Sequence, residues 1–291
     1  MPTALERQEA SEQVKLFFSL MQGLKPETEE RSFKMLPGEL LEQRYLMGMG
    51  LAAVGAQRLS DTCERMGMPA ALRAALRSGL PEADAVHFGY EQGAGAMRLK
   101  VCLEFRQRLN QALAARPASS VPPKAVAGVP TAVDMPSMGL PPVLLRLAYT
   151  WDQERPDQDA VAEYRGYPDL PVAGLFERLG GLYPASGEPP SLEAAERIIN
   201  LALRRTKKPL LYQEVSEAGN PRASFDIRLR ATELRVADLH PWLVAAGAGY
   251  GIAPARFDAF FRQVRERALG HLSGGTDRQG RDFLTVYHAV R

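Results

Sequence analysis

The sequence predicts an α+β fold in which repeated helix/β-hairpin units form an antiparallel sheet or a closed β-barrel with helices on the outer face. Four pairs of alternating segments are joined by glycine-bearing or polar turns, which is typical of hairpins, and helical patterns separate the pairs. A hairpin followed by a helix long enough to cross it gives a sheet with helices on one face only. Because barrel closure removes exposed edges, such units can close, and the sequence leaves both architectures open.

The first 80 residues are expected to form a helical segment that packs on the main body. Apolar residues recur at intervals of three and four from Ala4 to Leu24, which predicts an amphipathic helix. Beyond Pro37-Gly38 a longer helical pattern runs from Glu39 to about Met66, and its glycines require tertiary support. A short helix is predicted from Pro69 to Ser78, with proline in its first turn.

Residues 81–291 form the predicted body of repeated hairpins and helices. Its hairpins join Ala85–Glu91 to Met97–Phe105, Val143–Trp151 to Ala160–Tyr167, Pro209–Val215 to Ser224–Arg230, and Leu269–Ser273 to Phe283–Val290. Its helices are expected at Arg106–Ala115, Leu170–Leu179, Ser191–Arg205 with Ser191 as N-cap, Val236–Ala246 and Pro254–Ala268. A Pro-rich stretch at 116–142 is expected to be a surface loop or linker.

The strand at 97–105 alternates apolar and polar residues throughout. One face carries Leu99, Val101, Leu103 and Phe105, and the other carries Arg98, Lys100, Cys102 and Glu104. The apolar face needs a helix layer to cover it, whereas the charged face needs water, a ligand or mutual pairing. What occupies this polar face is therefore the question of function.

Composition narrows the class of protein. The chain has 291 residues and a net charge of +2, which is too near neutral for a general nucleic-acid or electrostatic membrane binder. Cys63 and Cys102 are the only cysteines, so a disulfide framework and a cysteine-rich zinc site are excluded. No apolar run approaches the ~20 residues of a membrane span. We expect a soluble cytoplasmic protein.

Basic residues recur on the polar faces of later strands. By parity the inward set comprises Arg98, Lys100, Arg146, Arg165, Arg228 and Arg230, with Lys208 close to the start of a strand. The alternative is a solvated sheet face on which these cations pair with Glu104, Glu163 and Asp226 across strands. Tyrosines such as Tyr212 and Tyr287 also lie on strands, where they either pack or donate hydrogen bonds.

A ring of helix-strand-strand-helix units about 300 residues long, with Arg and Lys on inward strand faces such as Arg98–Phe105, resembles the aromatic prenyltransferases of the ABBA or PT-barrel type. The resemblance covers Pro81 to Arg291 and depends on architecture, not on a signature motif. It departs from the family in showing four hairpins where five are expected, and in placing three helices ahead of the first hairpin.

The resemblance implies that inward Arg, Lys and Tyr side chains bind an isoprenoid diphosphate and shield an allylic cation. The substrate-binding candidates are then Arg98, Lys100, Arg146, Arg165, Lys208, Tyr212, Arg228, Arg230 and Tyr287. A ring nucleophile needs a base for its proton, and Glu104, Glu163 and Asp226 are the candidates.

Three hypotheses follow for function. The first is a transferase that joins a prenyl group to an aromatic acceptor, as in secondary metabolite biosynthesis. The second is a non-catalytic small-molecule-binding protein or assembly partner of a biosynthetic complex, and the third is a cofactor-independent isomerase or cyclase. No metal site is predicted and no cofactor is required, although Mg²⁺ could accompany a diphosphate. A small-molecule substrate is the expected partner, with no nucleic acid.

Overall fold

The computed structural model describes residues 12–93, 96–115, 140–183 and 189–289. The strands are β1 (Thr28–Leu36), β2 (Glu39–Gly50), β3 (Ala85–Gly93), β4 (Ala96–Glu104), β5 (Val143–Trp151), β6 (Ala160–Tyr167), β7 (Tyr212–Glu217), β8 (Ala223–Arg228), β9 (Leu269–Thr276) and β10 (Asp282–Ala289). Within the described residues these ten strands form one closed antiparallel barrel in the order β1-β10-β9-β8-β7-β6-β5-β4-β3-β2. The predicted fold class is confirmed, and the barrel is the correct choice of the two architectures.

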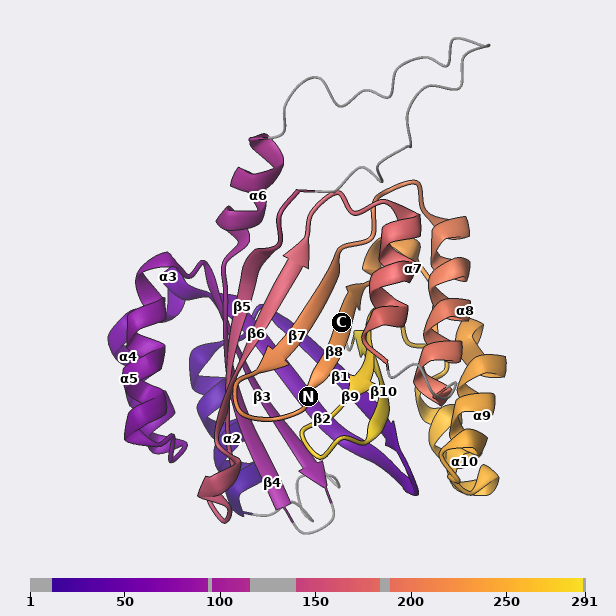
Figure 1. The fold of residues 1–291 in the computed structure, drawn as a ribbon. Coiled ribbons are helices and arrows are strands. Elements are labelled where there is room, and N and C mark those ends of the chain that lie inside the picture. The colour runs from indigo at the N-terminus through magenta and orange to yellow at the C-terminus, as the bar shows by residue number, and fades with distance from the viewer. Residues whose placement is uncertain (1–11, 94–95, 116–139, 184–188, 290–291) are drawn as a thin grey trace.

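Helices lie outside the barrel in two groups. The helices are α2 (Glu12–Leu24), α3 (Leu51–Val54), α4 (Ala56–Arg65), α5 (Ala70–Gly79), α6 (Arg106–Ala114), α7 (Val172–Gly181), α8 (Pro190–Arg205), α9 (His240–Gly249) and α10 (Pro254–Val264), with 3₁₀ turns η1 (Leu80–Glu82), η2 (Pro156–Gln158), η3 (Arg230–Thr232) and η4 (Val236–Leu239). Helices α3 to α5 flank one side of the barrel and α7 to α10 the other (Figure 1).

Each helix group buries an apolar core against the outward faces of the strands. In one core, apolar residues of α2, α4 and α5 pack on outward residues of β2 to β5, including Val101 and Leu103. In the other, apolar residues of α7 to α10 pack on β1 and β7 to β10, including Phe225 and Ile227. The apolar surface buried on folding therefore lies between the strands and the outer helices, and the interior of the barrel can hold polar side chains.

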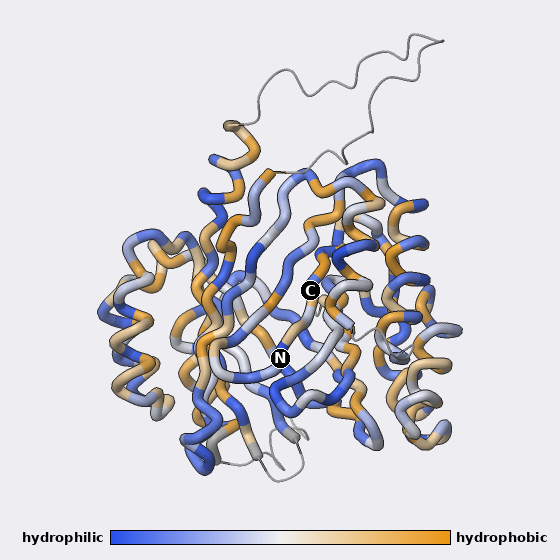
Figure 2. The backbone as a smooth tube through the Cα atoms, viewed as in Figure 1, coloured by the Kyte–Doolittle hydropathy of each residue, from blue (hydrophilic) through white to orange (hydrophobic). Residues whose placement is uncertain are grey.

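The alternation of the strand sequences produces this arrangement. Hydrophilic and hydrophobic segments follow one another along the strands (Figure 2). On β4, Leu99, Val101 and Leu103 are buried in the outer core, whereas Arg98 and Lys100 line a cavity inside the barrel. The predicted division of this strand into an apolar outer face and a polar inner face is confirmed.

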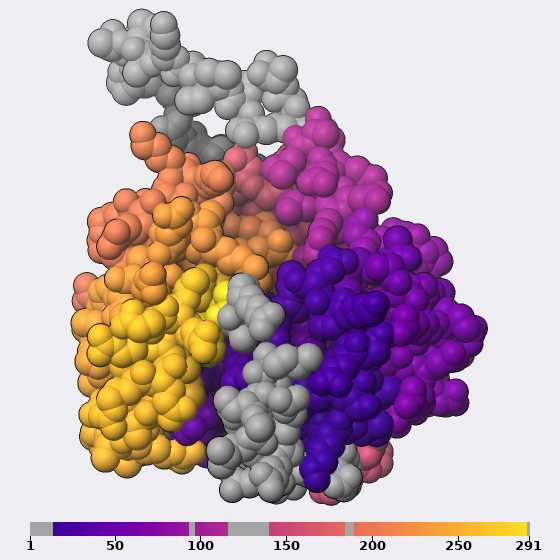
Figure 3. Space-filling model, turned by 180° about the vertical axis from the view of Figure 1, so that it is seen from behind, coloured from indigo at the N-terminus to yellow at the C-terminus, as the bar shows by residue number. Residues whose placement is uncertain are grey.

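The barrel closes through its first and last strands. Strand β1 pairs antiparallel with β10, with Glu30 opposite Ala289 and Met35 opposite Leu284. On its other edge β1 pairs with β2. Figure 3 shows the N-terminal and C-terminal parts of the chain on the same face of the molecule.

The helical segment predicted for residues 1–80 is wrong for residues 28–50, which form the hairpin of β1 and β2. This is the fifth hairpin that the sequence pattern missed. Gly38 adopts a left-handed φ of 75° in the turn. Gly48 lies so close to its neighbours that an added Cβ would meet Thr28 Oγ1 of β1 at 2.6 Å and His87 Cε1 of β3 at 2.7 Å. The glycines of this stretch thus permit close approach within the barrel and do not serve helix packing.

Other expected elements are confirmed with shifted ends. The predicted N-cap at Ser191 is wrong, because α8 begins with Pro190 at its first turn and Ser191 lies inside the helix, where its backbone N–H donates to Asp282. The helix predicted from Val236 is divided into η4 and α9. Most of the Pro-rich stretch at 116–142, and the start of the helix expected from Ala4, lie outside the described residues.

No helix in the described part of the chain combines the length and the apolar character needed to cross a membrane.

Candidate functional site

A cavity of about 430 Å³ lies inside the barrel at the end where the hairpin turns gather. Its size is within the range of small-molecule sites. The described lining includes eight cationic side chains but only three acidic ones. The cations are Lys34, Arg44, Arg98, Lys100, Arg155, Arg222, Arg278 and Arg281, and the acids are Glu39, Glu91 and Asp277. We refer to this cavity as the upper pocket; the end of the barrel that holds it is drawn at the bottom of Figure 1.

Strand register places one row of these side chains side by side. Arg98 is opposite Glu91, Glu91 is opposite Arg44, and Arg44 is opposite Ser32. Ser32 is in turn opposite Tyr287 on β10. Because paired residues on neighbouring strands point to the same face of a sheet, the row faces the pocket together.

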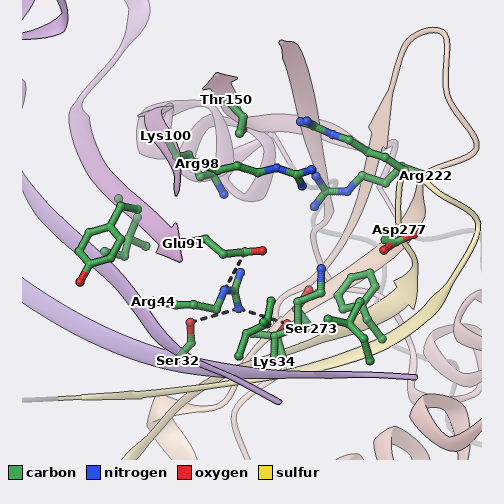
Figure 4. Close-up of a pocket in the computed structure, with 18 of the residues that line it drawn as sticks. Ser32, Lys34, Arg44, Glu91, Arg98, Lys100, Thr150, Arg222, Ser273 and Asp277 are labelled. Atoms are coloured by element: carbon green, nitrogen blue, oxygen red, sulfur yellow. Dashed lines mark hydrogen bonds and ion pairs between the residues drawn. The ribbon is translucent and has the colours of Figure 1, made fainter. Parts of the chain in front are cut away.

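Glu91 is neutralised within the row. Arg44 Nε donates to Glu91 Oε2 at 2.8 Å, and Arg44 Nη1 donates to Ser32 Oγ at 3.2 Å (Figure 4). Burial alone would raise the pKa of the Glu91 carboxyl, but the cations Arg44, Lys34 and Arg98 hold it below its usual range. Glu91 is therefore a carboxylate at neutral pH.

Three further cations of the pocket have no carboxylate ion-pair partner among the described residues. Lys100 Nζ donates to Tyr164 Oη at 3.0 Å, and Arg98 donates to the side chain of Gln158. Lys34 Nζ lies 4.3 Å from the centre of the Phe283 ring. Because the cations of the described lining outnumber its acids, the site favours an anion.

The pKa of Lys34 reflects this excess of positive charge. Burial, together with the nearby cations Arg44 and Arg222, lowers the pKa of Lys34 to about 8. The Lys100 ammonium differs, because the neighbouring Cys102, Tyr164 and Tyr287 outweigh its burial and raise its pKa. Lys100 is thus charged throughout the physiological range, whereas Lys34 titrates near it.

Arginines from two turns join three connections at the rim of the pocket. Arg222 and Arg278 both pair with Glu217, whose side chain is 0% exposed. Arg278 Nη1 also donates to the backbone carbonyl of Gln158 at 2.7 Å, joining the β9–β10 turn to the β5–β6 connection. Figure 4 shows Arg98 and Arg222 reaching into the pocket from opposite sides.

Below the upper pocket, the lumen is filled by paired charges, which we call the lower plug. Its carboxylates are Glu30, Glu104 and Asp226, and its cationic or imidazole partners are His87, Arg146, Arg228, Arg230 and His271. Glu104 Oε1 lies 3.6 Å from Arg146 Nη2 and also contacts Arg228. A very small cavity, bordered on one side by Lys100, Tyr164 and Tyr287, lies between the two regions.

The carboxylates of the plug are held ionised. Burial opposes ionisation of Glu104, but His87, Arg146 and Arg228 lower the pKa of its carboxyl. Asp226 accepts from Gln213 Nε2 at 3.0 Å and lies 3.2 Å from His271 Nδ1. Despite burial, His271 and the neighbouring arginines lower the pKa of Asp226 to about 2.

Among the predicted site residues, Arg98, Lys100 and Tyr287 line the upper pocket. A second set lies deeper, in the lower plug, and consists of Glu104, Arg146, Asp226 and Arg228. Of the predicted bases that face the lumen, neither Glu104 nor Asp226 lines the upper pocket.

Five predicted residues do not face the pocket. Glu163 and Arg165 pair with each other on the outside, with side chains 43% and 47% exposed. Tyr212 is buried in the outer core, and Lys208 is exposed in the loop before β7. Arg230 lies beyond the end of β8, where its half-exposed side chain pairs with Glu30. The predicted inward orientation is wrong for the first three, because the faces of β6 and β7 are the reverse of those assumed.

Sequence reasoning missed several pocket residues. Arg44 lies on β2, which was predicted as a helix, and Ser32 and Lys34 lie on β1, for which no element was predicted. Glu91 and Arg222 were not among the predicted site residues. The usable signal was the alternation of Ser32 and Lys34 with Phe33 and Met35, just ahead of Pro37-Gly38.

The strand tyrosines differ in their surroundings. Tyr164 and Tyr287 line the upper pocket, and Tyr45 and Tyr90 border it as well as one of the outer cores. Tyr149 and Tyr212 are buried in the outer cores, and Tyr90 packs against Phe17 and Phe18 of α2. Within the described residues there is no cluster of three or more His, Cys, Asp or Glu side chains that could hold a metal ion.

Comparisons with known proteins identify the fold. No family model and no curated protein sequence matches the chain. A crystal structure of 5-dimethylallyltryptophan synthase from Streptomyces coelicolor is 14% identical, with a TM-score of 0.51 over 96% of this chain and 92% of that one. The structure of NotF in complex with brevianamide F and DMSPP is 13% identical, with a TM-score of 0.50 over 98% and 90%. At the level of the fold, the predicted resemblance to ABBA prenyltransferases is confirmed.

Proposed function

We propose that the protein transfers a prenyl group from an isoprenoid diphosphate to an aromatic acceptor inside the barrel. The single observation that supports this most is the presence of Lys34, Arg98 and Lys100 in one pocket without carboxylate partners among the described residues. A diphosphate carries about three negative charges near neutral pH and matches this set. The shared fold with the dimethylallyltryptophan synthase structure is consistent with the proposal.

The first step is the departure of the diphosphate. The allylic carbon–oxygen bond of the donor breaks, and its electron pair leaves with the diphosphate oxygen. Lys34, Arg98 and Lys100 stabilise the charge that develops on this leaving group. Tyr164 and Tyr287 line the same pocket, and their electron-rich rings stabilise the allylic cation that remains.

The second step joins the two substrates. The acceptor ring donates an electron pair to the allylic cation, forming a carbon–carbon bond, and the ring then loses a proton. Glu91 accepts this proton, because it lines the upper pocket between Arg44 and Arg98 on the neighbouring strands. Glu104 and Asp226 lie in the lower plug. A protonated ring is a strong acid, so even a carboxylate of low pKa can accept from it.

We also expect no requirement for Mg²⁺. Lysine and arginine supply the positive charge around the leaving group, and the acids Glu91 and Asp277 are already engaged by Arg44 and Arg281. Activity should therefore persist in excess chelator. The expected cytoplasmic location and a protein partner in a biosynthetic complex stay predictions.

The test uses the full chain with dimethylallyl or geranyl diphosphate and a panel of phenols, naphthols and indoles. Mass spectrometry should detect a prenylated acceptor, and calorimetry should detect donor binding that weakens in Arg98→Ala and Lys100→Ala. Arg165→Ala, on the outer face, is the matched control. Intact donor binding in both pocket variants would overturn the proposal. Binding of both substrates without product would favour the non-catalytic alternative.

A further inference from the structure

The β5–β6 connection, residues 152–159, lies at the end of the barrel that holds the upper pocket (Figure 1). We call this connection the strap. Apart from Pro156, all its residues are polar or charged, so apolar burial contributes little to holding it in place. A segment that is held mainly by hydrogen bonds near the surface opens at a low cost in free energy.

Gln158 joins the strap to the wall of the pocket. Its side-chain carbonyl accepts a hydrogen bond from Arg98 of β4, and its backbone carbonyl accepts one from Arg278 Nη1 at 2.7 Å. Arg98 is also one of the cations that match the donor diphosphate. A guanidinium has five N–H donors, so Arg98 can hold Gln158 and a diphosphate oxygen at the same time. The strap and the donor site therefore share one residue.

The side of the strap that faces the pocket carries no free negative charge. Within the described lining, the strap contributes Arg155 and Gln158 but none of its carboxylates. Asp152 is buried and paired with Arg155, whereas Glu154 and Asp157 are exposed to solvent. A strap fastened over the pocket therefore does not place a carboxylate against a bound diphosphate.

Covering Arg98 has a cost that an anion removes. Burial, together with the like charges of Arg278 and Arg155, lowers the pKa of the Arg98 guanidinium, although Glu91 acts in the opposite direction. The fastened strap thus covers a cation whose charged form is disfavoured by its surroundings. A diphosphate beside Arg98 supplies an opposing charge, so it should stabilise the fastened strap. By linkage, the fastened strap stabilises the bound donor to the same extent.

We infer that donor binding fastens the strap across the mouth of the upper pocket, and that Gln158 is the positioning residue that couples the two through Arg98. The inference rests on the proposed function and adds a closing step at the same site. A fastened strap limits the access of water to the allylic cation. Water that reached this cation would form a carbon–oxygen bond and lose a proton, which gives an allylic alcohol in place of the prenylated acceptor.

The first measurement is hydrogen exchange of the strap in the full chain, with and without saturating inorganic pyrophosphate. The backbone N–H groups of Arg155, Gln158 and Asp159 each donate to a carbonyl within the strap, so their exchange reports its order. Pyrophosphate should slow this exchange at least about fivefold. In Gln158→Ala the slowing should fall below about twofold, because the bond to Arg98 is lost while the backbone carbonyl can still accept from Arg278.

Two further variants separate this coupling from a merely structural role. Gln153→Ala is the matched control, because Gln153 belongs to the strap but donates to the backbone carbonyl of Met66, which does not line the pocket. It should leave the slowing by pyrophosphate unchanged. Gln158→Glu gives Arg98 a carboxylate partner, so exchange should already be slow before pyrophosphate is added, and pyrophosphate should bind at least about fivefold more weakly.

The second measurement follows the products formed from dimethylallyl diphosphate and an acceptor. In Gln158→Ala, dimethylallyl alcohol should rise at least about threefold relative to the prenylated acceptor. Pyrophosphate that binds without slowing the exchange overturns the inference alone, as does slowing that Gln158→Ala leaves intact or a Gln158→Glu strap that exchanges as fast as the unmodified one. Absence of pyrophosphate binding by the unmodified chain overturns the proposed function as well.

Discussion

The upper pocket and the lower plug are built from the same residue types on the same inward faces, yet they differ in how charge is matched. In the plug, Arg146 and Arg228 meet Glu104. In the pocket, Lys34 and Lys100 have no carboxylate ion-pair partner within the described residues. Inward-facing cations therefore contribute to structure where the register brings a carboxylate beside them, and to binding where it does not.

Replacement of Glu104 is the strongest test of the difference in charge pairing between the lower plug and the upper pocket. Replacing it with glutamine leaves Arg146 and Arg228 buried without their counterion, so the free energy of unfolding should fall by about 3–5 kcal/mol. Urea denaturation followed by circular dichroism measures the change. A loss below about 1 kcal/mol would mean that the plug is not held together by these pairs.

Lys100→Met should show the opposite behaviour. Lys100 has no carboxylate to leave unpaired among the described residues, so the variant should stay folded, with a denaturation midpoint close to that of the unmodified chain. Donor affinity should fall about 10- to 100-fold, since hydrogen bonds to charged groups contribute about 1.5–3 kcal/mol. Calorimetric titration with dimethylallyl diphosphate gives the affinity. Unfolding of this variant would place Lys100 with the plug.

Titration of Lys34 should make the donor affinity of the upper pocket depend on pH. Its pKa is lowered to about 8, so the ammonium is present below that pH and is lost above it. The nearby Arg44, Arg222 and Glu91 keep their charges over this range, because the pKa of each arginine is raised and that of Glu91 is lowered. Donor affinity should therefore decrease by up to about tenfold per pH unit above pH 8. Lys34→Arg should remove the decrease, and a decrease that survives this substitution would assign it to another group.

The smallest effect is expected outside the barrel. Arg165→Ala breaks an exposed ion pair with Glu163, so both the free energy of unfolding and the donor affinity should stay within about 0.5 kcal/mol. A loss of donor binding in this variant would contradict the outward orientation of the Arg165 side chain.

The alternation of apolar and polar residues along a strand predicted correctly which side chains face the lumen where helices cover the outer face of that strand. On β4 and β8, buried Val101 and Ile227 face helices, so their polar neighbours must face the lumen. On β6 the rule fails, because the strand runs between the two helix groups and its outer face carries Glu163 and Arg165. A polar residue there has water available outside the barrel, and alternation alone cannot say which face is inside.

One wall of the candidate site is supplied by the hairpin of β1 and β2, which the sequence pattern did not predict. Leu40, Leu41 and Met47 fit a helical spacing, whereas their strand conformation depends on pairing with β1 and β3. Tertiary pairing thus overrides local preference at the point that supplies Lys34 and Arg44. Whether a cation in the lumen is paired also depends on register across strands, which no single segment contains.

Closure of the barrel through β1 and β10 has a consequence for how the chain folds. The pairing joins residue 30 to residue 289, so it cannot form until the segment that contains residue 289 has been synthesised. Contacts of such long sequence separation slow folding, because the loop entropy is lost before the contacts can compensate. We expect the hairpins to form and join in chain order, since β2 pairs with β3, while the outer edge of β1 waits unpaired for β10. During that interval the nascent chain is most exposed to edge-to-edge aggregation.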